Sequence, residues 1–125
     1  MPVMERTMRQ IHDGTCSVAA TADLIAAKWT PLLLHDLSEG PRRFNMLEHA
    51  CPGISPRTLS ERLRVLEQEG IVLRHSYPES PPRVEYELTD KGAALLPIID
   101  EMRRFGRNWL IPEPRKSPRK VAASR

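Results

Sequence analysis

The hydrophobic pattern of this 125-residue chain changes its period at Gly70. Before Gly70, apolar residues recur three or four positions apart in short segments, which is the spacing of amphipathic helices. After Gly70, residues 71–77 and 83–88 have the pattern of two strands, and the second alternates strictly between polar and apolar side chains. Residues 78–82 (PESPP) predict a stiff hairpin turn between them. We therefore expect an α+β fold that is mostly helical.

Proline and glycine residues divide the helical part into short units. Thr30-Pro31 and Ser55-Pro56 each predict a helix start, because a capping side chain precedes a proline in the first turn. Pro97 is expected to kink or split the last helix, which begins near Thr89. The resulting order is three helices, a Pro-Gly turn, a fourth helix, a hairpin and a long final helix. This is the order of a winged helix-turn-helix with a two-stranded wing.

The fourth helix carries the candidate DNA-reading surface. Its apolar stripe is Leu59, Leu63 and Leu66, and helical geometry directs Arg57 and Arg64 to the opposite face. Arginine can bind guanine or phosphate, and in such folds the polar face of this helix enters the major groove. With neighbouring basic residues and the hairpin rim, the predicted DNA-binding residues are Arg42, Arg43, Ser55, Arg57, Thr58, Ser60, Glu61, Arg64 and Arg83.

Two alternatives to this interpretation stay open. Glu61 can pair with Arg57 or Arg64 along the helix, which would make this face an ordinary solvated surface. Arg83 can equally be a strand-end residue that contacts only water.

The charge of the chain is unevenly distributed. Residues 112–125 hold five basic residues and one acidic residue, whereas residues 1–111 hold 14 basic and 15 acidic residues. We expect residues 1–15 to form a flexible segment, residues 16–111 to form the winged domain with its dimerisation helices, and residues 112–125 to form a disordered basic tail. Five arginines between positions 42 and 64 then form a local basic patch on a near-neutral body, which indicates double-stranded DNA as a partner.

About three quarters of the chain resembles the HxlR family of winged-helix regulators, which are related to the MarR type. The matching segments are CSVAATADLIAAKWTPLLL, GPRRFNMLEHACPGISPRTLSERLRVLEQEGIV and YPESPPRVEYELTDKGAALLPIID. The resemblance implies a transcription regulator that dimerises through its first and last helices and binds DNA through the helix starting near Ser55. It also implies that Lys28-Trp29, Tyr86 and Gly92 occupy family-typical structural positions. The chain departs from the family at Ser17, where proline commonly follows the cysteine, and in its basic tail.

A homodimer is also plausible from the residues themselves. The last helix carries apolar side chains on several sides, more than a small domain is expected to bury. The alternative is that Phe105 and Trp109 pack within the monomer against the first helix. The predicted dimer-interface residues are Ile25, Leu95, Ile99, Met102, Phe105 and Trp109.

The remaining chemistry centres on one thiol. Cys16 lies just before the first helix, where free N–H groups can lower a thiol pKa, so we consider it a redox candidate; a buried small residue is the alternative.

The four histidines are scattered, so no metal site is predicted, and no cofactor motif or enzyme signature is visible. Without an apolar leader or span, we expect a cytoplasmic protein with no membrane partner. Any small-molecule effector is unknown. Three functions remain: a DNA-binding regulator, a regulator with thiol control at Cys16, and a protein-interaction module without DNA binding.

Overall fold

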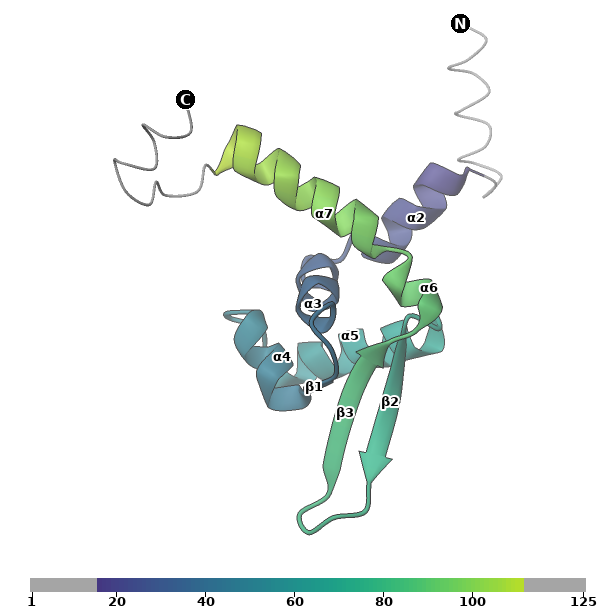
Figure 1. The fold of residues 1–125 in the computed structure, drawn as a ribbon, viewed down its shortest axis with the longest axis vertical. Coiled ribbons are helices and arrows are strands. Elements are labelled where there is room, and N and C mark those ends of the chain that lie inside the picture. Colours follow the sequence, from purple (N-terminus) through teal and green to yellow (C-terminus); the bar gives the residue numbers. More distant parts are fainter. Residues whose placement is uncertain (1–15, 112–125) are drawn as a thin grey trace, which may run out of the picture.

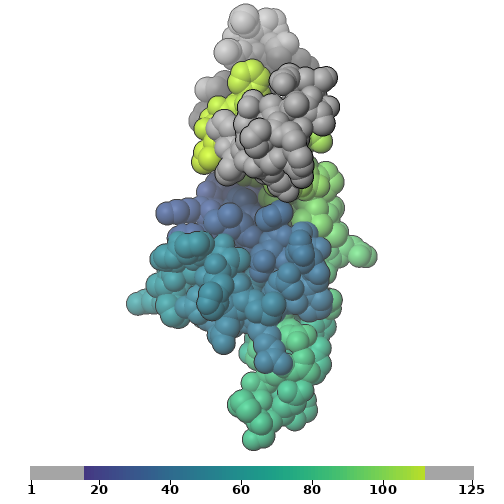
Figure 2. All heavy atoms as spheres, turned by 60° about the vertical axis from the view of Figure 1, so that its left-hand side comes forward, coloured from purple at the N-terminus to yellow at the C-terminus, as the bar shows by residue number. Residues whose placement is uncertain are grey.

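The computed structural model describes residues 16–111, so the predicted flexible segment and basic tail lie outside the described residues. Helices α4 and α5 lie below α3, the hairpin projects from one end of the molecule, and α7 extends from the other (Figure 1; Figure 2). The elements in chain order are α2 (Ser17–Ile25), α3 (Thr30–Leu37), β1 (Arg42–Arg43), α4 (Phe44–Ala50), α5 (Pro56–Gln68), β2 (Val72–Tyr77), β3 (Arg83–Leu88), α6 (Asp90–Ala93), α7 (Leu96–Phe105) and the π-helical η1 (Gly106–Leu110).

Capping side chains fix three of the helix starts. The side chains of Cys16, Ser55 and Thr89 each accept a hydrogen bond from a backbone N–H in the first turn of α2, α5 and α6. Helix α3 differs from the prediction, because Trp29 precedes it and Thr30 is already its first residue. Pro97 lies in the first turn of α7, where a missing N–H costs nothing, and the final helix is split into α6 and α7 as expected.

The sheet has three antiparallel strands in the order β1-β3-β2, whereas the sequence predicts only the two strands of the wing. Strands β2 and β3 pair from Val72 opposite Leu88 to Tyr77 opposite Arg83. The additional strand, β1, places Arg42 opposite Tyr86. Two residues are too short to show an alternating pattern, so β1 left no periodic signal in the sequence.

The core lies where α3, α4, α5 and the base of the sheet meet. The predicted stripe of α5 is fully buried there, and the first turn of α7 closes the core above α3. Leu95 and Ile99 belong to this core, with only 8% and 4% of their surface exposed. This corrects the prediction that they line a dimer interface, because the protomer itself already covers them. The buried apolar residues are Leu33, Leu34, Leu37, Leu47, Cys51, Ile54, Leu59, Leu63, Leu66, Ile71, Val72, Tyr86, Leu95 and Ile99.

Candidate nucleic-acid interface

A sharp turn joins α4 to α5 and sets the direction of α5. Cys51 and Ile54 anchor the turn in the core, and the Ile54 N–H donates to the Cys51 carbonyl at 3.0 Å. Gly53 adopts φ +92°, a left-handed conformation that glycine reaches without a Cβ clash. The predicted Pro-Gly turn therefore produces a helix-turn-helix in which the first turn of α5 is at the surface.

The hydroxyl groups at the start of α5 are used by the helix itself. Ser55 Oγ accepts the N–H of Thr58 at 3.0 Å and donates to Thr58 Oγ1 at 2.9 Å. Both residues remain exposed. These hydroxyls therefore cap the first turn of α5, and the N-terminal end of a helix is the end that favours an anion.

The outer face of α5 carries two arginines in different states. Arg64 Nη2 lies 2.6 Å from Glu61 Oε2, which is the helix-surface pair that the sequence left open as an alternative. This hydrogen bond and the Arg64 charge hold the pKa of the Glu61 carboxyl below its usual value. Arg57 is exposed and forms no hydrogen bond or ion pair within residues 16–111. Ser60 is exposed on the same helix.

The two arginines of β1 point to opposite faces of the sheet. Arg42 turns back toward α3, where its Nε lies 3.4 Å from Asp36 Oδ2 and its Nη2 lies 3.9 Å from Glu39 Oε1. Arg42 is therefore already paired inside the protomer, which argues against its predicted DNA contact. Arg43 is exposed, and its charge contributes to a lowered pKa of the Glu79 carboxyl at the wing. Strand β1 thus brings one exposed cation to the wing.

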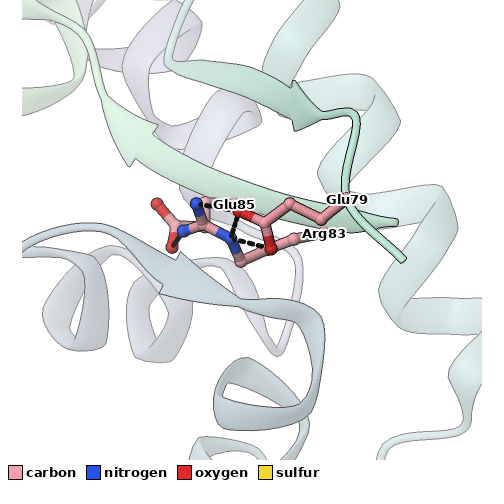
Figure 3. Close-up of polar contacts among 3 residues, drawn as sticks. All are labelled: Glu79, Arg83 and Glu85. Atoms are coloured by element: carbon pink, nitrogen blue, oxygen red, sulfur yellow. Dashed lines mark hydrogen bonds and ion pairs between the residues drawn. The ribbon is translucent and has the colours of Figure 1, made fainter. Parts of the chain in front are cut away.

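Arg83 is held by two carboxylates of the wing, as Figure 3 shows. Its Nε and Nη2 donate to the Glu79 carboxylate at 2.8–3.2 Å, and its Nη1 donates to Glu85 Oε2 at 2.5 Å. The guanidinium carbon lies 4.0 Å from the centroid of the Tyr77 ring. The hydrogen bond from Arg83 lowers the pKa of Glu79, and the two carboxylates raise that of Arg83. We call Glu79, Arg83 and Glu85 the Arg83 cluster.

The alternative that Arg83 contacts only water is wrong, because Glu79 and Glu85 bind it, and the same pairing argues against its predicted DNA contact. Within the cluster two carboxylates surround the single guanidinium, and the nearby charge of Arg43 also acts on Glu79. Sequence reasoning missed the cluster, although a signal existed. Strict alternation directs residues 83 and 85 to the same face of β3, where opposite charges meet.

The two cysteines occupy different environments. Cys16 is half-buried, and its Sγ accepts the Ala19 N–H at 3.5 Å. Cys51 is fully buried in the core, and burial, together with the negative charge of Asp36, raises the pKa of its thiol. Within the described part of the chain, no three His, Cys, Asp or Glu residues are grouped so that they could hold a metal ion.

The end of α7 and η1 form an exposed apolar surface. Phe105 and Trp109 have 57% and 74% of their surface exposed, and Met102 is exposed beside them. The alternative that Phe105 and Trp109 pack against the first helix of the same monomer is therefore wrong. Ile25 is half-buried against the core. We call Met102, Phe105, Trp109, Leu110 and Ile111 the dimer arm, since the proposal below assigns them to that contact.

Residues 24–114 match the sequence model of the HxlR-like helix-turn-helix family. This chain belongs to that family. It is 46% identical over 90 residues to the uncharacterized HTH-type transcriptional regulator YvaP of Bacillus subtilis, covering 72% of this chain and 83% of YvaP.

Solved structures of other transcriptional regulators have the same fold. A MarR-family transcriptional regulator from Porphyromonas gingivalis matches with a TM-score of 0.74 and 41% identity, covering 76% of this chain and 93% of that one. The redox regulator HypR in its reduced form matches with a TM-score of 0.72 and 37% identity, covering 88% of this chain and all of HypR.

These matches confirm the predicted family and the winged helix-turn-helix fold. This HxlR-like protein is a helix-turn-helix transcriptional regulator, and the relatives that it matches are named as regulators. None of the helices within residues 16–111 has the length and apolar character needed to cross a membrane.

Proposed function

We propose that this HxlR-like regulator is a non-enzymatic homodimer that binds double-stranded DNA at an inverted repeat, with α5 in the major groove. The observation that supports this most strongly is Arg57. It lies in the first turn of α5, is exposed, and has no hydrogen-bond or ion-pair partner within residues 16–111. An exposed guanidinium without an ion-pair partner, at the N-terminal end of a helix, is suited to bind a phosphate or a guanine edge.

Arg64 has a complementary role in this proposal. Its ion pair with Glu61 directs the guanidinium along the outer face of α5, and it leaves other N–H donors available. Glu61 is thus a positioning residue for Arg64. In this proposal the exposed Arg43 on β1 contacts the phosphate backbone of the DNA beside the wing. Arg42 and Arg83 do not, because each is paired with carboxylates of the protein.

DNA binding is tested with a duplex that the wild-type protein selects from a random library. Arg57→Ala and Arg64→Ala are each expected to weaken binding by about 1–3 kcal/mol if the lost contact is bidentate to a base. Arg104→Ala is the matched control, because Arg104 pairs with Glu101 on α7 as Arg64 pairs with Glu61 on α5. Unchanged affinity of both α5 variants would refute the docking. A protein that binds no selected duplex would support the interaction-module alternative.

The second copy in this proposal covers the dimer arm. Large apolar side chains gathered at the end of one helix are more often interface than free surface. A groove of about 390 Å³ between α2 and the start of α7, lined by Val18, Ile25 and Ile98 among others, offers the second copy a further apolar surface. Light scattering is expected to give twice the chain mass of 14.3 kDa at micromolar concentration. Trp109→Ser should shift the protein toward the monomer, whereas a monomeric wild type would contradict the assembly.

A second candidate function is thiol control of DNA binding at Cys16. It is supported by the relative HypR, which is described as a redox regulator, and by the partly accessible Sγ at the start of α2. Cys16 is expected to react with an alkylating probe faster than Cys51, because Cys51 is fully buried and its thiol pKa is raised. Oxidant should change DNA affinity in wild type but not in Cys16→Ser. Equal, slow labelling of both thiols would exclude regulation of DNA binding through Cys16.

A further inference from the structure

The C-terminal end of α5 is held by the residues at the start of α6, which follows the wing in the chain. Lys91 Nζ donates to the Glu69 carbonyl at 2.7 Å, and Thr89 Oγ1 donates to the Gly70 carbonyl at 2.5 Å. The Thr89 N–H donates to the Ile71 carbonyl at 3.0 Å. Three consecutive carbonyls therefore receive donors from one short segment, residues 89–92 (TDKG), which we call the α5–α6 clamp.

The clamp adds to a helix end that already satisfies its own last turn. The N–H groups of Gly70 and Ile71 donate to the carbonyls of Glu67 and Leu66, a Schellman arrangement. The clamp binds the carbonyls of residues 69–71, just beyond this arrangement. It also places the Lys91 ammonium at the negative end of the α5 dipole, where a cation is favourable.

Close packing keeps α6 in place against this helix end. A Cβ at Gly92 would lie well inside 3.0 Å of the Ile71 carbonyl oxygen, so α6 is in direct backbone contact with the chain just after α5. The same helix is capped internally by Thr89, whose Oγ1 accepts the Gly92 N–H at 3.0 Å. One threonine side chain thus bonds both the end of α5 and the start of α6.

From α6 the hydrogen bonds continue toward the dimer arm. The Leu95 N–H donates to the Gly92 carbonyl at 3.0 Å, and the Ile99 N–H donates to the Leu95 carbonyl at 3.1 Å. Leu95 and Ile99 are fixed in the core, whereas the far end of α7 carries the exposed apolar residues. The end of α5 and the start of α7 are therefore linked by a short path of backbone and side-chain bonds.

Helix α2, which lies on another side of α5, lacks a comparable link. Within residues 16–111, no hydrogen bond or ion pair joins α2 to α5. A cavity of about 220 Å³ lies between them instead. Its lining residues are Ala20, Asp23, Leu24, Arg62, Val65 and Glu69.

We propose that Thr89 and Lys91 are positioning residues for DNA recognition: the clamp fixes the direction of α5 relative to α7, and so sets the separation of the two recognition helices in the dimer. The inference rests on the proposed function. Specific binding requires both α5 helices to reach half-sites about 34–36 Å apart. Non-specific binding depends mainly on charge and tolerates a shifted helix.

The test compares Lys91→Met, which keeps the apolar stem but removes the donor, with Lys91→Arg, which keeps a cation and donors. Affinities are measured for the duplex that wild type selects, for versions with one base pair added to or removed from its centre, and for an unrelated duplex. Arg103→Met is the matched control, because it removes one exposed charge from α7 at a site paired with Asp100 and not with α5.

Lys91→Met is expected to lower the ratio of selected to unrelated binding about three- to tenfold, the effect of one net hydrogen bond. Its preference for the original half-site spacing should broaden, whereas Lys91→Arg and Arg103→Met should behave like wild type. Hydrogen exchange of the amides of residues 66–71 gives a measurement independent of DNA, and it should be faster in Lys91→Met with the rest of the core unchanged.

The outcomes separate the two proposals. If wild type selects no duplex, the proposed function itself fails. If wild type binds but Lys91→Met keeps the ratio, the spacing preference and the exchange rates, the clamp is not a positioning element and the proposed function stands. An equal loss on selected and unrelated duplexes would also overturn the clamp proposal, because it would reduce Lys91 to a general positive charge.

Discussion

Adding one methyl group at Gly92 should disrupt the junction between α5 and α6. A helix is usually less stable with glycine than with alanine at an interior position, by about 1 kcal/mol. Gly92→Ala would therefore stabilise the protein if the new methyl group had free space. Here the new Cβ would lie well inside 3.0 Å of the Ile71 carbonyl oxygen and 3.1 Å from Leu88 Cδ2. The first neighbour is backbone and cannot rotate away, so α6 has to move.

The expected size of the effect follows from three contributions. Overpacking of this kind costs about 1–3 kcal/mol, and the upper part of that range applies because a backbone atom is struck. Moving α6 also weakens the Thr89 cap, a loss of about 1 kcal/mol, and the gain in helix propensity offsets about 1 kcal/mol. The net loss is about 2–3 kcal/mol, which lowers the melting temperature of a domain this size by roughly 10–20 °C.

Thermal unfolding followed by circular dichroism at one fixed protein concentration measures this loss. Gly106→Ala is the control, because a Cβ there meets nothing within 4 Å and the residue has a helical φ of −61°. It should melt at or slightly above the wild-type temperature. A Gly92→Ala protein that melts as high as Gly106→Ala would refute the close approach of α6 to Ile71.

Three further predictions concern the wing, the tail and the turn. Arg83 lowers the pKa of Glu79 in the folded protein, so their ion pair is present above the ordinary carboxyl pKa and is lost as the pH falls through the lower folded value. A carbon-detected NMR titration of Glu79 should show this low midpoint, and Arg83→Met should return the midpoint to the ordinary range. Removing residues 112–125 deletes a net charge of +4 and should make the log K versus log salt slope shallower by about 0.9 for each lost phosphate contact, with little change in the melting temperature; an unchanged slope would show that the tail does not contact DNA. Gly53→Ala should cost about 1–2 kcal/mol in urea unfolding, since φ is +92°; no loss would mean that the turn adopts another conformation.

The sequence predicted the fold well where local signals were strong. The start of α5 at Ser55 and its buried stripe of Leu59, Leu63 and Leu66 follow from capping chemistry and helical spacing. Alternation likewise predicted β3. Strand β1 was not predictable, because two residues have no measurable period and their pairing partner lies more than 40 positions away.

The candidate site was predictable in composition but less so in detail. Periodicity placed Arg57 and Arg64 on the outer face of α5, yet it could not decide whether Glu61 pairs with one of them. For Arg42, the deciding feature is its tertiary contact with Asp36. Leu95 was misassigned for a related reason, since an apolar residue has the same sequence signal whether its own core or a second copy covers it.

Strand β1 also affects how this protein folds during synthesis and where it can be truncated. The helix-turn-helix is a continuous segment that ends before Gly70, but Arg42 and Arg43 find their backbone partners only at Tyr86 and Glu85. A chain emerging from the ribosome cannot complete this pairing until both wing strands have been synthesised, and a fragment that stops at α5 would expose the edge of β1 and part of the core. The helix-turn-helix is therefore contiguous in sequence without being an autonomous folding unit, and grafting it together with β1 onto another protein would leave that strand unpaired.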